Sequence, residues 1–163
     1  MVILLLAIVD FARIYTTTMS VESAAREAAD FGTTLGAVKW QPGTMDDTVA
    51  KMQQRACAAA SNLPDYSDPD GDPSTGCSNP SFVYCLTSSA TSPCGPKDAS
   101  DTCEDPLRAE PCTVTVTLTY DFHLLAPFNL EFFGVTIGVP STLSFQRDST
   151  YAMTDIDLAP VAP

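Results

Sequence analysis

The chain has 163 residues, of which 45% are hydrophobic, and a formal net charge of −12 at pH 7. This length suits one domain of ordinary size, and the hydrophobic content excludes a wholly disordered chain. The negative charge argues against nucleic acid as a partner and against docking on anionic lipid head groups, because both need clustered Lys and Arg. We therefore expect a folded, acidic domain.

The chain opens with an almost purely apolar run, Met1 to Val9, which leads directly into Asp10-Phe11-Ala12-Arg13. The helical pattern continues to about Ala37. A membrane-crossing helix needs roughly 20 mostly apolar residues, and this run is shorter. It also lacks the basic start and the small-residue cleavage site of a secretory signal peptide. We predict a membrane or stalk helix over residues 1–38 whose apolar part begins upstream of Met1; a soluble helix with a buried apolar end is the alternative.

Small residues recur at a spacing of four in this helix, at Ser20, Ala24, Ala28 and Gly32. Positions four apart share one helix face, so these side chains form a ridge with almost no bulk. Such ridges let two helix backbones approach closely, as in pairs of membrane helices. The ridge predicts either a contact with a helix of another subunit or packing on the domain's own sheet, and the sequence does not choose between them.

A turn signal, Trp40-Gln41-Pro42-Gly43, separates this helix from a second one, which we expect from about Met45 to Ser61. Thr44 is placed to cap the second helix, with Asp47 three residues later in a weaker form of the capping box. Its expected apolar stripe consists of Met45, Val49, Met52, Ala56 and Ala59. We interpret Trp40 as a packing residue at this corner.

The cysteines are six in number: Cys57, Cys77, Cys85, Cys94, Cys103 and Cys112. None belongs to a C-x-x-C pair, and the chain has a single histidine, whereas structural zinc sites combine close Cys pairs or Cys with His. We therefore predict disulfides in an oxidising compartment and no metal site. Six cysteines allow 15 pairings, and the sequence leaves the pairing open.

Residues 62–111 are rich in Pro, Asp, Ser and Cys, and we expect them to be an insertion in a globular domain spanning residues 39–163. A short strand is predicted within them, from Ser81 to Leu86. The run from Asp68 to Asp72 is similar to the start of a calcium loop, but Pro73 and Asn79 stand where the EF-hand pattern requires Gly and Glu. Simple turns are the favoured interpretation, and calcium binding stays open.

The last third of the chain shows strand patterns. From Cys112 to Tyr120, apolar residues alternate with threonines, which predicts a strand with one apolar face. We further expect an apolar link from Leu124 to Gly134 and an edge segment from Tyr151 to Met153. Between them, the residues from Val135 to Val139 and from Leu143 to Arg147 predict either one bent strand or two short strands, broken at Pro140. Together these elements predict an α+β fold in which a long and a shorter helix pack on a small antiparallel sheet.

The sequence contains no pattern typical of an enzyme. The G-x-S-x-G elbow and the phosphate-binding glycine loops are absent, and no spacing of Asp and Glu marks a matched acid and base. The single His123 follows the strongest predicted strand and is interpreted as a structural residue. We expect no catalytic residue and no cofactor.

The order of these parts resembles the TadE-like proteins of Tad (Flp-type) pilus assembly. The resemblance lies in Asp10-Phe11-Ala12-Arg13, Ala25-Arg26-Glu27, Val114 to Tyr120, Tyr120-Asp121-Phe122, Ala126-Pro127-Phe128 and Leu143 to Arg147. The resemblance does not extend to the cysteine-rich residues 62–111. Members of this family carry a Gly cleavage point and a Glu upstream of the apolar run. Neither is present here, which fits a helix that begins upstream of Met1.

The resemblance implies a pilin-like fold and a minor pilin-like subunit, single-pass in the inner membrane or part of an extracellular pilus. Its first helix would contact the membrane and other pilin-like subunits, while its acidic, disulfide-bonded head would face outside. A second hypothesis comes from the residues themselves. The chain would then be a secreted or membrane-anchored adhesin whose cysteine-rich loop, held on a rigid scaffold, carries a recognition surface.

Overall fold

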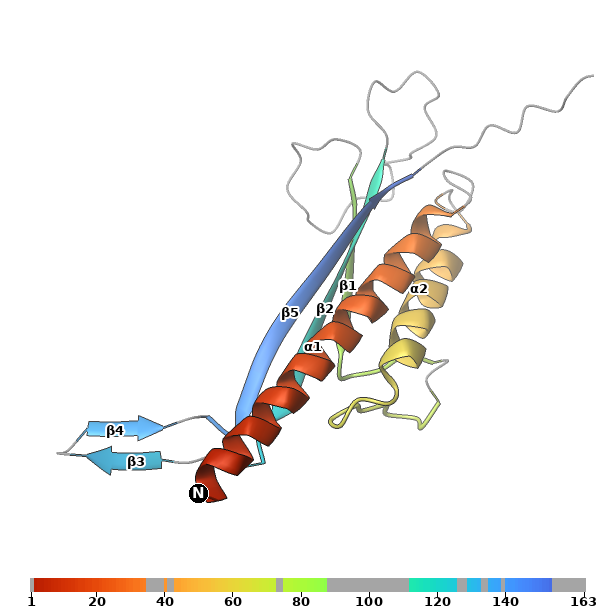
Figure 1. Ribbon diagram of the computed structural model, residues 1–163. Helices are drawn as coiled ribbons and strands as arrows, with labels where there is room; N and C mark the ends of the chain where they lie inside the picture. The colour runs from red at the N-terminus through yellow and green to blue at the C-terminus, as the bar shows by residue number, and fades with distance from the viewer. Residues whose placement is uncertain are drawn as a thin grey trace, which may run out of the picture.

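The fold is described from a computed structural model, which covers residues 2–34, 40, 43–72, 75–87, 112–125, 129–132, 135–138 and 140–153. Its elements are α1 (Val2–Thr33), α2 (Met45–Ala60), β1 (Ser81–Thr87), β2 (Thr113–His123), β3 (Asn129–Phe132), β4 (Val135–Gly138) and β5 (Thr142–Ala152). Figure 1 shows α1 and α2 side by side, lying along a sheet of long strands. The α+β prediction is confirmed.

The main sheet is antiparallel, with strand order β1-β2-β5. Its central strand, β2, buries every second side chain completely: Val114, Val116, Leu118, Tyr120 and Phe122. The threonines between them lie half-buried on the other face. Since successive side chains of a strand point to opposite faces, the alternation directs one face of the sheet toward both helices and leaves a polar face behind it.

The last strand differs from the prediction. In place of a strand from Leu143 to Arg147 and a separate edge segment, β5 runs without a break and pairs with β2 from His123↔Thr142 to Thr113↔Ala152. The partner strand explains this length, because each added residue of β5 gains a ladder position opposite β2. The same pairing extends β2 three residues beyond its predicted end.

The predicted apolar link also contains structure. Within it lies β3, which pairs with β4 in an antiparallel hairpin that is separate from the main sheet. The strand predicted from Val135 to Val139 is confirmed as β4. The alternation in β3 covers only four residues, which is too short to distinguish a strand from a link by periodicity alone.

The core joins the two helices to the sheet. Four alanines of α1 are fully buried: Ala24, Ala25, Ala28 and Ala29. Trp40 closes one end of this core: its Nε1 donates to the carbonyl oxygen of Gly32 at 2.8 Å, and its ring lies 5.9 Å from that of Tyr84. The packing role predicted for Trp40 is confirmed. Helix α1 ends at Thr33 and is followed by Thr34 in a turn, and the rest of its predicted length, from residue 35, lies outside the described residues.

The predicted capping box of α2 is wrong. Thr44 precedes the helix, but its backbone is already helical (φ −115°, ψ −18°) and its side chain makes no capping hydrogen bond. Asp47 instead pairs with Lys51, one turn later, at 2.6 Å. The apolar stripe also differs at its end, because Ala59 is exposed while Cys57 and Ala60 are buried.

Candidate functional site

The first half of α1 carries most of the exposed apolar surface found in the described residues. Of twelve large hydrophobic side chains that are exposed, eight belong to α1: Leu4, Leu5, Leu6, Ile8, Val9, Phe11, Tyr15 and Met19. The most exposed is Phe11, at 72%. An exposed apolar patch of this kind on a folded domain marks a contact with lipid or with another protein.

Five of these residues form a continuous stripe, Leu4, Ile8, Phe11, Tyr15 and Met19, which we call the outer stripe. Their spacing of three or four residues places them on one side of the helix. The stripe runs over 16 residues, from Leu4 to Met19, and its 15 residue steps extend about 22 Å at 1.5 Å per residue. By length and composition, the segment Leu4–Thr33 could cross a membrane, and only 17% of its most apolar stretch is buried inside the chain. A core helix of a soluble protein would be mostly buried.

A polar contact marks the place where α1 begins to pack on the rest of the fold, which we call the head. The Asp10 side chain is nearly buried, and its Oδ1 accepts hydrogen bonds from Arg13 Nη1 and from the backbone N–H of Leu125, both at 3.2 Å. The Arg13 guanidinium lies 4.8 Å from the centre of the Phe122 ring. Because a buried carboxylate is costly unless it is paired and hydrogen-bonded, these contacts fix the third turn of α1 against the end of β2.

The sequence pattern alone does not predict this role of Asp10 and Arg13. The available signal was an acid and a base three residues apart, directly after an apolar run, since such a pair can meet on one helix face. The partners Phe122 and Leu125 are more than 100 residues away in the chain and leave no local signal.

The ridge of small residues packs inside the chain. Ala24 and Ala28 are fully buried, and a Cβ on Gly32 would lie 2.8 Å from Met52 Sδ of α2 and 3.2 Å from Val114 Cγ1 of β2. Ser20 is half-buried, and its Oγ bonds to the Thr16 carbonyl oxygen at 3.1 Å. Contact of this ridge with another subunit stays a prediction, and it would require α2 and the sheet to move away from α1.

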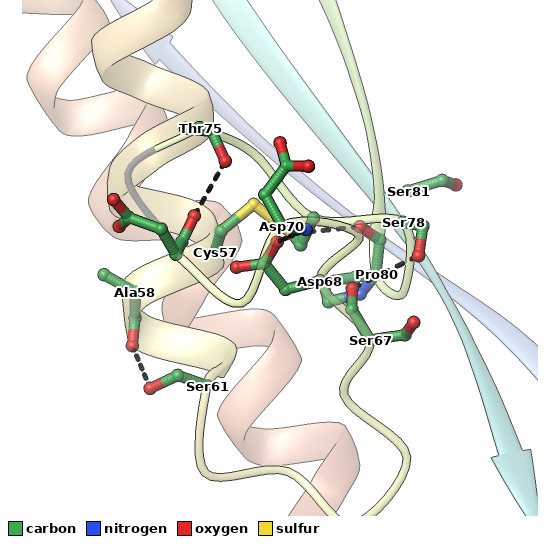
Figure 2. The surroundings of a disulfide bond; sticks show 12 residues. Cys57, Ala58, Ser61, Ser67, Asp68, Asp70, Thr75, Ser78, Pro80 and Ser81 are labelled. Atoms are coloured by element: carbon green, nitrogen blue, oxygen red, sulfur yellow. Dashed lines mark hydrogen bonds between the residues drawn. A yellow bond between two sulfur atoms is a disulfide. The ribbon is translucent and has the colours of Figure 1, made fainter.

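The beginning of the cysteine-rich segment is tied to the fold by a disulfide between Cys57 of α2 and Cys77 (Figure 2). Cys85 and Cys112 are also disulfide-bonded, while Cys94 and Cys103 lie outside the described residues. The strand predicted within this segment is confirmed as β1, and it pairs along its whole length with β2. Residues 62–111 are therefore not one continuous loop.

Hydrogen bonds hold the segment between α2 and β1 against the end of β2. The Asn79 side chain donates to the Asp65 and Asp121 carbonyl oxygens at 2.6 and 2.8 Å, and accepts from the Asp121 N–H at 2.9 Å. Asp65 Oδ2 accepts from the His123 backbone N–H at 2.8 Å, while His123 Nδ1 lies 3.3 Å from Asp65 Oδ1. These contacts give His123 a structural position at the junction of loop and strand.

The run from Asp68 to Asp72 forms a turn. Asp68 Oδ1 accepts from the Asp70 backbone N–H at 2.9 Å, which is an Asx-type contact (Figure 2). Within the described part of the chain, no group of three or more His, Cys, Asp or Glu side chains is placed to hold a metal ion.

Removing the Cys57–Cys77 bond should lower the free energy of unfolding by about 3 kcal/mol, because the bond closes a loop of 20 residues and so restricts the unfolded chain. The Cys57→Ala, Cys77→Ala double variant and the parent should be compared by denaturant unfolding in detergent. Ser61→Ala, an exposed position in the same loop, is the matched control. Equal stability of the double variant and the parent would contradict the expectation.

We expect ionisation of the Tyr120 hydroxyl to lower the stability of the fold at alkaline pH. Burial raises the pKa of this phenol, and the nearby Asp65 carboxylate acts in the same direction, whereas the bond from the Asp65 N–H and the charge of Arg13 oppose the rise. The folded pKa thus lies above the unfolded value of about 10. The contribution to stability is complete below pH 10 and is lost as the pH rises through the folded pKa. Unfolding free energies measured across this range should fall less steeply in Tyr120→Phe, and identical slopes would refute this.

Comparison with known proteins singles out α1. Residues 1–30 match the family model described as TadE-like protein. Neither a curated protein nor a solved structure matches the chain. The matched segment contains the whole outer stripe and the Asp10–Arg13 pair, so the resemblance expected from the sequence is confirmed for the helix that carries the exposed apolar surface.

Proposed function

We propose that this protein is a non-enzymatic, minor pilin-like component of a Tad-type pilus or secretion system. The outer stripe carries the proposal: a row of exposed apolar side chains on α1, inside the segment that matches TadE-like proteins. TadE-like pilus proteins are structural rather than enzymatic. The first half of α1 is held in the inner membrane and later packs among the helices of other pilin-like subunits.

The physical chemistry of the two halves of the chain supports this division. Water solvates the outer stripe poorly, so α1 requires lipid or neighbouring helices over its first half. The rest of the chain is acidic and disulfide-bonded, which suits a soluble head in an oxidising compartment outside the membrane. The head thus faces the extracytoplasmic side, and α1 holds it there.

The test is a charge placed in the outer stripe. Phe11→Glu should strongly reduce the number of surface pili when the variant replaces the parent gene, because a carboxylate cannot pack among apolar helices without a large desolvation cost. Ser23→Glu, at an exposed position of α1 next to the head, is the matched control and should support normal piliation. Both variants should keep the head folded, as judged by protease resistance. Normal pili with Phe11→Glu would contradict the proposal.

A binding role of the loop between α2 and β1 is the second candidate. The loop is fixed by the Cys57–Cys77 disulfide, and its exposed Asp70 and Asp72 present negative charge on that scaffold. Rigid loops of this kind often carry recognition surfaces. An Asp70→Asn, Asp72→Asn variant that is fully piliated but does not adhere would support this candidate, whereas unchanged adherence would refute it.

A further inference from the structure

The β3–β4 hairpin is anchored at the point where the apolar half of α1 meets the head. Just before the hairpin, the Leu125 N–H donates to Asp10 Oδ1 at 3.2 Å. The neighbouring Leu124 N–H donates to the carbonyl oxygen of Ser141, which follows the hairpin, at 3.0 Å, so the two ends of the hairpin segment are held together. The chain therefore leaves and re-enters the head at the third turn of α1, and Figure 1 shows the hairpin projecting sideways at the end of the molecule where α1 begins.

The pairing register gives this hairpin two different faces. Leu130 pairs with Ile137 and Phe132 with Val135, and residues that alternate along paired strands share a face. The other face carries Asn129↔Gly138 and Glu131↔Thr136. One face is thus entirely apolar and the other polar. A two-stranded hairpin is marginally stable in water by itself, and a layer packed against an apolar face stabilises it.

The segment that contains the hairpin, from Leu124 to Ser141, carries far fewer charged residues than the rest of this acidic chain. From Leu124 to Ser141 there is one charged residue, Glu131, in a protein whose net charge is −12. The segment also holds Phe128, Phe132 and Phe133. Such a composition suits an uncharged apolar environment better than a charged protein surface.

We propose that the β3–β4 hairpin lies in the interfacial layer of the bilayer, with Leu130, Phe132, Val135 and Ile137 against the lipid. This inference rests on the proposed function, because it assumes that the first half of α1 is in the membrane. We assign the bilayer as the partner of the apolar face because the base of the hairpin is joined to Asp10. This residue borders the apolar run of α1, which the lipid already surrounds in the proposed function. The head would then touch the membrane at two places, which fixes its tilt as well as its distance.

The depth of the hairpin follows from its backbone. The outer edges of two paired strands leave N–H and C=O groups without ladder partners, and such open edges do not occur within the hydrocarbon region. The hairpin can therefore reach the interface and the upper acyl chains but not the centre of the bilayer.

Tryptophan quenching by brominated lipids tests this depth. The full chain has one tryptophan, Trp40, which is buried beside Gly32, about 33 Å along α1 from Asp10. It should remain unquenched and so provides an internal reference. In vesicles of zwitterionic phosphatidylcholine, Phe132→Trp and Leu130→Trp should be quenched more by bromine near the head group than by bromine near the bilayer centre. Thr136→Trp, on the polar face, should be quenched less.

A fourth variant separates this inference from the proposed function. Leu5→Trp reports insertion of α1. Quenching of Leu5→Trp without quenching of Phe132→Trp or Leu130→Trp would overturn the hairpin inference and leave the anchoring of α1 intact. The absence of quenching in all three would overturn the anchoring itself. Hairpin fluorescence that changes only at high protein-to-lipid ratios would assign its apolar face to a second copy of the chain, which also overturns the inference.

Discussion

Phe122→Ala should lower the free energy of unfolding of the head by about 3–5 kcal/mol, which is the usual cost of deleting a buried aromatic ring. The Phe122 ring is fully buried near the end of β2, and the Arg13 guanidinium lies over it at 4.8 Å. Its loss would leave a cavity between the sheet and α1 and remove the surface on which Arg13 rests. Denaturant unfolding in detergent, followed by circular dichroism, would measure the effect.

The matched control for this variant is Val83→Ala. Val83 is 60% exposed and pairs with Thr117, on the face of the sheet away from the helices. Its truncation should change the free energy of unfolding by no more than about 0.5 kcal/mol. Equal effects of Phe122→Ala and Val83→Ala would mean that α1 does not pack on β2 as described.

The double substitution Leu5→Arg, Ile8→Arg should release the protein from the membrane while leaving the head folded. Each arginine costs up to about 2.5–3.5 kcal/mol at the centre of a membrane helix. Both side chains are exposed, at 60% and 58%, so the head loses no packing. The fraction of protein released by alkaline carbonate extraction measures membrane retention, and the Cys57–Cys77 bond reports that the head is oxidised and folded.

A matched double variant controls for added charge. Ser23→Arg with Asp30→Arg also places two arginines on exposed positions of α1, but in the half that packs on the head. This variant should remain in the membrane fraction. Retention of both double variants, or release of both, would show that the apolar half of α1 is not what holds the protein.

The two halves of α1 explain why these substitutions should behave so differently. In its second half, the helix buries four alanines, Ala24, Ala25, Ala28 and Ala29, in the core with α2 and the sheet, and their small size lets the backbones approach closely. The outer stripe ends at Met19, before the first of these alanines, and only Asp10 and Thr17 are buried alongside it. One continuous helix thus serves as a core element of the head and as an apolar stalk.

The sequence predicted the elements whose signals are local. The alternation in β2 and the helical spacing of α2 both cover several periods, so each identifies its element without reference to a partner. The place of Trp40 in a turn correctly predicts its packing role, because a single large aromatic ring at a corner is stabilised by burial.

The missed features depend on residues far apart in the chain. The full length of β5 is set by its pairing with β2, and β3 is too short to show a period. The burial of Asp10 depends on Phe122 and Leu125, which no spacing near Asp10 reveals. The same applies to the ridge of small residues. Its spacing fits membrane helix pairs and intradomain packing equally well, and the position of α2 places three of its members inside the chain.

Photo-crosslinking with lipids that carry a diazirine on the acyl chain tests the central claim most directly, since it uses the unmodified protein in a bilayer. Peptide mapping should find lipid adducts at the outer stripe, above all between Leu4 and Phe11, and none in the segment from Ala24 to Gly32. Adducts that are absent from the first turns of α1, or equally frequent in both halves of the helix, would contradict the division of α1 between membrane and head.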